Sequence, residues 1–396
     1  MNHLSTFFLA TALAAFSLTA CSQQEKPAKY IFLFIGDGMS SSSVDLAESY
    51  LSYKAGKLGG EQLTFTRFPG LGFCTTYSAN SRITDSAAAG TAIATGCKTN
   101  NSSLGVDPQG QPLESVAKVL KNEYGYNIGI FSSVPLNHAT PAAFYANVSE
   151  RGSYYDITCQ LPLSNFDFVG GSGILHFSEE GQEMDSEEYL ESHGYDLVFG
   201  QKEFENSKAE KIVMVANPRK DRKDKVANYD VQDDELVTLD KMMEDCISHL
   251  GTDKAFFIMC EGGEIDWTLH SNKSMATVEA ILAFDKAIQK AYEFYLEHPR
   301  ETLIIVTADH ETGGLSLGSN GSGYSLHWDI VEERYAAGDK LSKEERKALN
   351  SASGFDFTSV HHNAGNVPVY SIGKGFEAFC GRIDNTQIKN KILCRQ

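Results

Sequence analysis

A serine that follows an aspartate and precedes small residues is the first place in the chain where chemistry could occur. Residues 83–91 read ITDSAAAGT, so Asp85 and Ser86 directly precede an alanine-rich run that favours the start of a helix. A serine hydroxyl at such a junction can serve as a nucleophile when a neighbouring base or metal ion activates it. Taken alone, the same pattern is typical of an ordinary helix start, so its meaning depends on partners elsewhere in the chain.

Carboxylates and imidazoles gather in five other short motifs. The motifs are IGDGM at residues 35–39, HATPAA at 138–143, EGGEIDWTLH at 261–270, TADHETGG at 307–314 and HHNAG at 361–365. Asp and His side chains are common zinc ligands, and Asp266 and His270 would share one helical face because they are four residues apart. The motifs therefore predict a site for more than one metal ion, in which two ions could stabilise the attacking and leaving oxygens of a displacement.

The elements that must position these residues alternate between apolar runs and helical patterns. This alternation predicts an α/β fold with a central, mainly parallel sheet sandwiched by helices. The clearest helix covers residues 273–296, where apolar side chains recur at three- and four-residue steps. The clearest strands cover residues 30–35, 127–132, 211–215, 255–260, 302–307 and 367–372.

The candidate ligands follow the ends of these strands. Ligand sites of open α/β sheets lie at the carboxyl ends of the strands, so we expect the side chains to meet at one sheet edge. The residues in question are Asp37 after the first strand, His138 and Thr140 after the second, Glu261 after the fourth, and Asp309 and His310 after the fifth.

The N-terminus predicts export. Residues 1–20 end in an apolar stretch that is shorter than the roughly 18 residues of a membrane helix, and Cys21 follows directly. This segment resembles a lipoprotein-type bacterial signal peptide, in which Cys21 becomes the lipidated first residue and 21–29 a linker. We therefore expect an exported protein, periplasmic or at the cell surface, that is lipid-anchored to a bacterial membrane. An ordinary secretory signal is the alternative.

The charge balance limits the partners. The chain has 52 acidic and 34 basic residues and a formal net charge of −18, so most of its surface should repel nucleic acid and anionic membranes. An anionic substrate must then be attracted locally, as bound divalent ions would do. Membrane contact is expected only through the lipid at Cys21.

The cysteines allow one candidate disulfide. Seven cysteines remain besides Cys21, and none forms a CxxC pair. Cys380 and Cys394 flank an expected terminal helix and could be joined in an oxidising compartment. Two buried thiols are the alternative.

The six motifs, in this order over residues 31–373, resemble those of the alkaline phosphatase family, metal-dependent phosphomonoesterases with a serine nucleophile. The resemblance implies hydrolysis of small phosphate monoesters to alcohol and inorganic phosphate through a phosphoserine, with two zinc ions and one magnesium ion. It also implies a catalytic domain over residues 30–396 and allows a homodimer. Polar and charged stretches near 177–234 and 316–359 are expected to be surface insertions.

The resemblance assigns the substrate contacts to three residues. Ser86 would be the nucleophile, Arg151 would clamp the phosphate, and Asp85 would hold the arginine. A planar guanidinium can fork onto two phosphate oxygens, which makes Arg151 the assignment most diagnostic for phosphate.

The resemblance also assigns eight metal ligands. In this assignment Asp266, His270 and His362 hold the first zinc; Asp37, Asp309 and His310 hold the second; and Asp37, Thr140 and Glu261 hold magnesium with waters. His361 competes with His362, and we choose His362 because its interval to Val367 matches the family. His138 and Trp267 are expected behind the ligands, where some family members have Asp and Lys. That difference leaves the affinity of the third metal site open.

Two other functional classes remain to be weighed. The first is another hydrolase of the same superfamily, namely a phosphodiesterase, a sulfatase or a phosphonate hydrolase; Arg151 counts against it, and Ser86 lacks the C/S-x-P-x-R context of a sulfatase. The second is a non-catalytic lipoprotein that binds phosphate or metal, which would lack the nucleophile or a ligand. Monoester hydrolysis needs accelerations of up to about 10²¹, whereas a general acid or base supplies only roughly 10² to 10⁴, so metals must carry most of the barrier.

Overall fold

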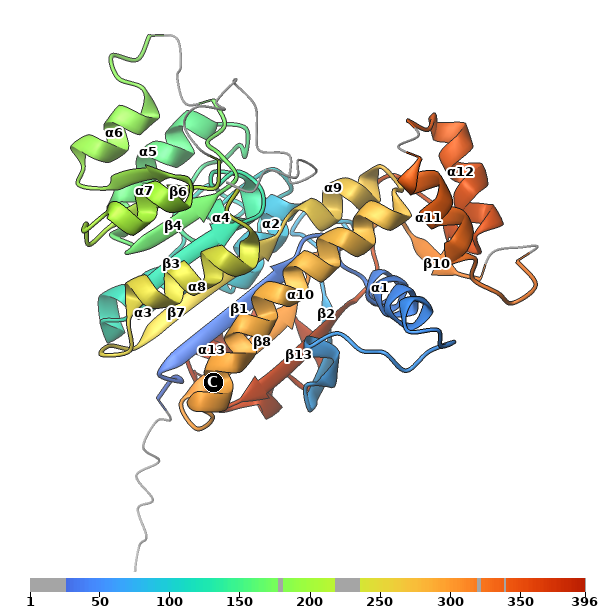
Figure 1. Cartoon of the computed structure of the whole chain (residues 1–396). Helices are drawn as coiled ribbons and strands as arrows, with labels where there is room; N and C mark the ends of the chain where they lie inside the picture. The colour runs from blue at the N-terminus through green and yellow to red at the C-terminus, as the bar shows by residue number, and fades with distance from the viewer. Residues whose placement is uncertain (1–25, 177–180, 218–235, 319–321, 338–339, 396) are drawn as a thin grey trace, which may run out of the picture.

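The computed structural model describes residues 26–176, 181–217, 236–318, 322–337 and 340–395, and one ten-stranded sheet runs through them (Figure 1). In spatial order its strands are β14 (Gly381–Asp384), β2 (Gly70–Thr75), β13 (Val367–Gly373), β8 (Thr302–Thr307), β1 (Tyr30–Gly36), β7 (Phe256–Gly262), β3 (Asn127–Ser132), β4 (Phe168–Gly171), β6 (Ile212–Val215) and β5 (Asp196–Phe199). Most neighbours are parallel, which confirms the expected α/β fold.

Helices cover both faces of this sheet (Figure 1). One layer contains α1 (Ser41–Lys54), α8 (Leu239–Leu250) and α10 (Ser274–Glu297), and the other contains α2 (Ser86–Thr95), α3 (Val116–Tyr124), α4 (Ala139–Ala142) and α13 (Gln387–Ile392). At the β5 end of the sheet lie α5 (Tyr154–Ser164), α6 (Ser186–Ser192) and α7 (Gly200–Asn206). Because both faces are covered, the central strands β1, β7 and β8 are buried along their whole length, and their sequences show no polar alternation.

The strand register aligns the carboxyl ends of the central strands. Ile35 of β1 pairs with Glu261 of β7 on one side and with Thr307 of β8 on the other, and Ser132 of β3 pairs with Glu261. The loops that follow these four strands therefore begin at one level of the sheet. This level is where the chemical residues were expected.

One strand runs against the expected direction. The run 367–372, predicted among the parallel strands, forms β13, which is antiparallel to both β2 and β8. A buried apolar run is the same in either direction, so the sequence pattern could not reveal this. Strand β2 was missed because it contains Gly70 and Gly72, which weaken a strand pattern.

The two polar segments differ in structure. Residues 177–234, expected to be a surface insertion around the predicted strand 211–215, contain β6 at that strand and also β5, and both lie at the edge of the main sheet. Within 316–359, the helices α11 (Trp328–Ala336) and α12 (Lys343–Ala352) and the short strand β11 (Phe355–Phe357), which pairs with β10 (Leu315–Leu317), stand outside the sheet (Figure 1). Trp328 and Phe355 anchor this unit on α1 and α10 through a separate apolar cluster with Leu46 and Val278.

Several predictions concern the chain termini. The proposed signal segment 1–20 and Cys21 lie outside the described residues. In the part of the chain that is described, no helix is long and apolar enough to cross a membrane. The seven described cysteines form no disulfide, so Cys380 and Cys394 are not joined.

Candidate active site

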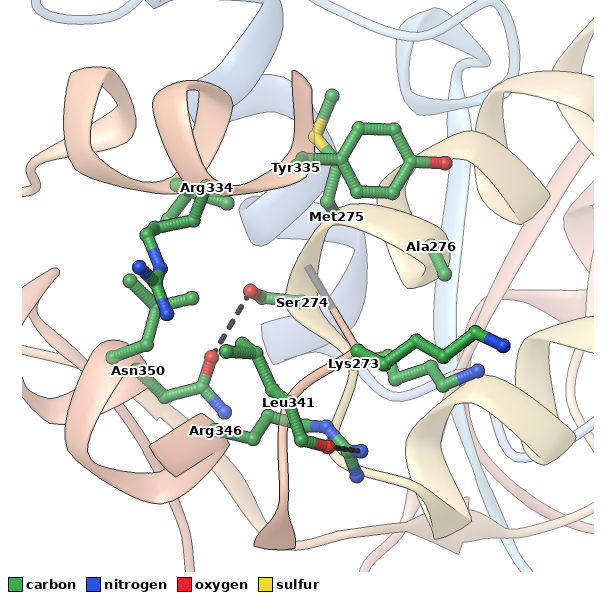
Figure 2. A pocket seen from close by; sticks show the side chains of 12 residues that line it. Lys273, Ser274, Met275, Ala276, Arg334, Tyr335, Leu341, Arg346 and Asn350 are labelled. Carbon is green, nitrogen blue, oxygen red and sulfur yellow. Dashed lines mark hydrogen bonds between the residues drawn. The ribbon is translucent and has the colours of Figure 1, made fainter. Parts of the chain in front are cut away.

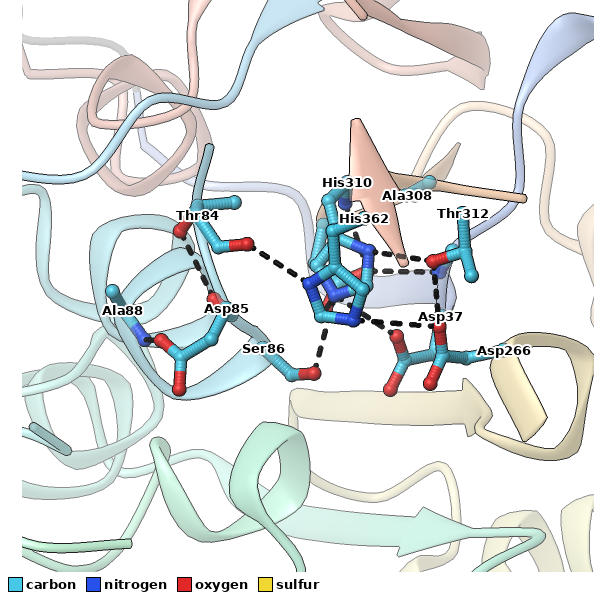
Figure 3. Close-up of polar contacts among 12 residues, drawn as sticks. Asp37, Thr84, Asp85, Ser86, Ala88, Asp266, Ala308, His310, Thr312 and His362 are labelled. Atoms are coloured by element: carbon cyan, nitrogen blue, oxygen red, sulfur yellow. Dashed lines mark hydrogen bonds and ion pairs between the residues drawn. The ribbon is translucent and has the colours of Figure 1, made fainter. Parts of the chain in front are cut away.

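The start of α2 presents Ser86 to the interior. Asp85 caps this helix, because its Oδ1 accepts a hydrogen bond from the backbone N–H of Ala88 at 3.0 Å. Ser86 is the first helical residue, and its side chain is 3% exposed. Its Oγ lies 3.2 Å from Nε2 of His310, and Figure 3 shows the hydroxyl directed toward the group of His310, Asp37 and Asp266. The hydroxyl also faces the positive end of the α2 dipole, which stabilises developing negative charge.

Arg151 is oriented by two partners. Its Nη1 donates to Asp85 Oδ2 at 3.2 Å, and its Nη2 lies 3.3 Å from Nε2 of His138. Asp85 Oδ2 also accepts from the backbone N–H of Ser102 at 3.1 Å, which fixes the carboxylate itself. A guanidinium has five N–H donors, so these contacts hold its plane while leaving donors for a ligand.

Three buried carboxylates follow the aligned strand ends. Asp37 follows β1, Glu261 is the penultimate residue of β7, and Asp309 follows β8, and all three are fully buried. Asp309 Oδ1 accepts from the backbone N–H of Gly38 at 3.1 Å, and Glu261 Oε2 accepts from the hydroxyl of Ser132. By contrast, neither oxygen of Asp37 nor Oδ2 of Asp309 accepts a hydrogen bond from the described residues.

The pKa values of these carboxylates indicate a site for a cation. Burial, followed by repulsion from Asp309 and other nearby carboxylates, raises the pKa of Asp37 well above its usual range. Burial also raises the pKa of Asp309 to about 8 and that of Glu261 to about 7. Buried carboxylates that lack partners are strongly disfavoured as anions unless a positive charge joins them. A bound metal ion would supply that charge, so the donor set fits the metals that the sequence predicts.

A second group of ligands meets at the end of α9 (Glu264–His270). Asp266 and His270 lie one helical turn apart, with His270 Nε2 3.2 Å from Asp266 Oδ2. His362 Nε2 lies 3.1 Å from His270 Nε2 and 3.7 Å from Asp266 Oδ1. The pairing of β12 (His362–Asn363) with β9 (Glu311–Thr312) brings His362 here, because it places His362 opposite Thr312.

The outer ring nitrogens fix the tautomers of this group. Nδ1 of His270 lies 2.6 Å from the carbonyl of Val360, and Nδ1 of His362 lies 2.9 Å from the carbonyl of Thr84. Since a carbonyl only accepts, each Nδ1 carries a proton, and in the neutral imidazole each Nε2 then offers a lone pair to a metal. Two lone pairs and a carboxylate within 3.7 Å of one another are arranged as metal ligands are.

His310 connects the two groups. Its Nε2 is 3.4 Å from both Asp37 Oδ1 and Asp309 Oδ2, while its Nδ1 lies 3.2 Å from the hydroxyl of Thr312. That hydroxyl donates to Asp266 Oδ1 at 2.6 Å, so it accepts from His310 Nδ1–H and leaves Nε2 unprotonated. Burial, followed by the nearby His362, also holds the pKa of His310 well below its usual value.

The structure places the remaining predicted residues as follows. Thr140 is buried in α4, and Trp267 stands edge-on to His138 at a ring distance of 5.9 Å. One ring nitrogen of His138 lies within 4.8 Å of carboxylate oxygens of Asp37 and Glu261, so His138 is itself a possible ligand rather than only a residue behind them. His361 is exposed and does not belong to the ligand group.

Sequence reasoning did not single out two residues that orient the ligands. Thr312 links His310 to Asp266, and Ser132 donates to Glu261. Thr312 lies inside the TADHETGG motif, two residues after His310, and Ser132 ends the second predicted strand. Their positions were therefore available, but a hydroxyl that serves as a hydrogen-bond relay has no spacing signature.

Comparisons with known proteins point to one family. A family model described as alkaline phosphatase matches residues 28–394. Alkaline phosphatase 4 of Bacillus subtilis is 28% identical, with 95% of this chain and 90% of that protein covered.

Solved structures of alkaline phosphatases superpose on most of the chain. The enzyme from the Antarctic bacterium TAB5 is 28% identical with a TM-score of 0.77, and 93% of this chain and 98% of that chain are covered. A cold-active enzyme from a psychrophilic Shewanella species is 26% identical with a TM-score of 0.79, covering 92% and 98%. A histidine-to-aspartate variant of the TAB5 enzyme, 27% identical with a TM-score of 0.75 and covering 93% and 97%, has been solved with Mg bound in its M3 site.

Proposed function

The chain belongs to the alkaline phosphatase family and is a phosphatase, and we propose that it hydrolyses phosphate monoesters by way of a phosphoserine at Ser86, with two zinc ions and one magnesium ion as cofactors. The observation that carries this proposal is the position of Ser86. Its hydroxyl lies at the N-terminus of α2, 3.2 Å from His310 Nε2. Beside it is a buried group of carboxylates whose negative charge is not balanced by nearby positive charge. Serine in this setting is a nucleophile rather than a helix cap, since Asp85 already caps α2.

The metals would be held by the two ligand groups. Asp266, His270 and His362 form one proposed zinc site, and Asp37, Asp309 and His310 form the other. Asp37, Glu261 and Thr140 form the proposed magnesium site, with His138 close enough to compete for it. When bound, these ions would neutralise the carboxylates and stabilise the charge that develops on the attacking and leaving oxygens.

The residues of the chain then account for both steps of the reaction. Ser86 Oγ loses its proton to solvent and attacks phosphorus, the bond between phosphorus and the alcohol oxygen breaks, and the alcohol leaves with a proton from solvent. Water next attacks the phosphoserine, the bond between phosphorus and Oγ breaks, phosphate departs, and Ser86 Oγ takes up a proton that the attacking water releases. Arg151 holds two phosphate oxygens throughout, because Asp85 and His138 fix the plane of its guanidinium.

Arg151 provides the test of the substrate class. A monoester offers its guanidinium two nonbridging oxygens and a second negative charge, whereas a diester has one oxygen esterified. Arg151→Ala should lower kcat/KM for phenyl phosphate by about 1.5–3 kcal/mol, roughly 10- to 150-fold, the worth of a charged hydrogen bond. It should affect a phenyl diester much less.

The control is Arg382→Ala, which removes an exposed arginine from the edge strand β14. This variant should match the parent with every substrate. If the parent prefers the diester or phenyl sulfate, or if Arg151→Ala slows all three substrates equally, the related diesterase or sulfatase activity is the better assignment.

We further propose that the chain is exported and lipid-anchored at Cys21, and that it acts outside the cytoplasm. The support is the apolar segment 7–20, which is followed directly by Cys21. A homodimer stays a prediction from the family resemblance.

A further inference from the structure

A pocket of about 680 Å³ opens beside His270, and the other residues that line it have no assigned role in the reaction. One wall is α12, and the opposite walls are the loop after His270 and the segment 356–361, which leads into β12. We call this cavity the α12 pocket. Its size falls within the range of small-molecule sites, about 300–1,000 Å³.

The face of α12 that lines this pocket is basic. Lys343, Arg346 and Lys347 stand at positions i, i+3 and i+4 of the helix and therefore share one side. The glutamates of the helix do not line the pocket, and Asp356 is the one acidic residue among those that do. The α12 pocket is thus locally cationic in a chain whose net charge is −18.

Two of these cations have no partner in the described chain. Lys343 and Lys347 are exposed, and the side chain of neither forms a hydrogen bond or an ion pair with another described residue. Two lysine side chains that line one cavity without an acidic partner among the described residues leave positive charge available for a ligand.

The basic helix is tied to the active site. Arg346 Nη1 donates to the carbonyl of Ser271 at 2.5 Å, directly after His270, and Asn350 Nδ2 donates to the carbonyl of Asn272 at 2.9 Å. The hydroxyl of Ser274 donates to Asn350 Oδ1 at 3.0 Å, as Figure 2 shows from the neighbouring cavity. These bonds fix α12 relative to His270, which lines the α12 pocket and contacts Asp266 and His362 inside the site.

We propose that the α12 pocket binds a second anionic group, a phosphate or a carboxylate, on the alcohol part of the substrate. This inference rests on the proposed phosphatase function and extends it to a substrate class, monoesters of negatively charged alcohols. In this proposal the alcohol part of a substrate bound at Ser86 passes His270, which belongs to the site and also lines the pocket, and its charge meets Lys343, Arg346 and Lys347. Attraction by exposed lysines also implies a preference that weakens with salt.

The test compares substrates that differ only in the second charge. The metal-loaded enzyme is assayed with pentyl phosphate, with 1,5-pentanediol bisphosphate, and with 6-phosphooxyhexanoate, which carries a carboxylate. We expect kcat/KM for the bisphosphate to exceed that for pentyl phosphate about tenfold, after correction for its two equivalent ends, because each lysine contributes about threefold. The kcat/KM for 6-phosphooxyhexanoate shows whether the pocket accepts any anion or needs a phosphate.

The variant pair is Lys343→Gln combined with Lys347→Gln, with Lys286→Gln as control. Lys286 is an exposed lysine of α10 that lines no part of the α12 pocket. The double variant should lower the ratio of bisphosphate to pentyl phosphate kcat/KM about tenfold, and the control should keep the parent ratio. A parent ratio near one, or a ratio unchanged in the double variant, would overturn the inference while leaving the phosphatase function intact. No turnover of pentyl phosphate by the metal-loaded parent would overturn both.

Discussion

Gly38 is a position where a single added methyl group should damage the metal site. The residue has a φ of +69°, and a Cβ built on it would lie 2.7 Å from Thr312 Oγ1 and 2.9 Å from Asp266 Oδ1. An L-residue in the left-handed region costs about 1–2 kcal/mol, and overpacking a tight position costs about 1–3 kcal/mol more. Gly38→Ala should therefore lower the free energy of unfolding by about 2–5 kcal/mol.

The same change should also reduce catalysis. Thr312 sets the orientation of His310, and Asp266 is a proposed zinc ligand, so displacing either side chain disturbs both ligand groups. A misplacement of about 1 Å can cost roughly 10²-fold in rate, and we expect a loss of that size in kcat/KM for 4-nitrophenyl phosphate, together with a lower zinc content.

Gly125→Ala is the matched control. Gly125 has a φ of +72° at the end of α3, and a Cβ added there would have no atom within 4 Å. Urea unfolding should give a loss of only about 1–2 kcal/mol, with kcat/KM and zinc content near those of the parent. The reasoning is refuted if the two variants lose equal stability and Gly38→Ala keeps full activity and zinc.

Three further outcomes are expected. The first concerns the protein after EDTA treatment. Burial raises the pKa of Asp309 to about 8 and that of Glu261 to about 7, so the folded metal-free protein keeps protons on both carboxylates near neutral pH. In the unfolded chain the same groups lose these protons above about pH 4. The free energy of unfolding should therefore fall from pH 5 to pH 8, by up to about 1.4 kcal/mol per pH unit for each group, and zinc with magnesium should remove this slope; a metal-free protein that gains stability over this range would contradict the account. His362→Ala should lose about one zinc per chain by elemental analysis, and His361→Ala should keep the parent content, since only His362 contacts His270. Cys21→Ser should move the protein from the membrane to the soluble exported fraction, and a parent that takes up no labelled fatty acid would show that the signal is an ordinary one.

Much of the site could be predicted from the sequence because its ligands follow strands. The end of a buried strand determines the position of each carboxylate, namely Asp37, Glu261 and Asp309. The parallel register of these strands then brings the three residues to one level of the sheet. Asp266 and His270 needed only helical spacing. A single strand or helix is therefore enough to position each of these residues.

Other features depend on contacts between distant segments, which a single sequence does not reveal. His362 reaches the site through a two-residue antiparallel pairing with β9, and periodicity cannot distinguish it from the exposed His361. The direction of β13 and the proximity of His138 to Asp37 and Glu261 are of the same kind, since both follow from how the chain returns to the sheet. The relay through Thr312 appears only once both ligand groups are in place.

The central claim is that Ser86 accepts the phosphoryl group, and acid-quench labelling tests it most directly. The metal-loaded protein is mixed with ³²P-labelled phosphate at acidic pH, where we expect a phosphoserine to accumulate, then denatured, digested and sequenced. We predict label on the peptide that contains Ser86, no label in Ser86→Ala, and parent labelling in Ser192→Ala, which removes an exposed serine of α6. An active parent that carries no label, or a label that persists in Ser86→Ala, would contradict the account.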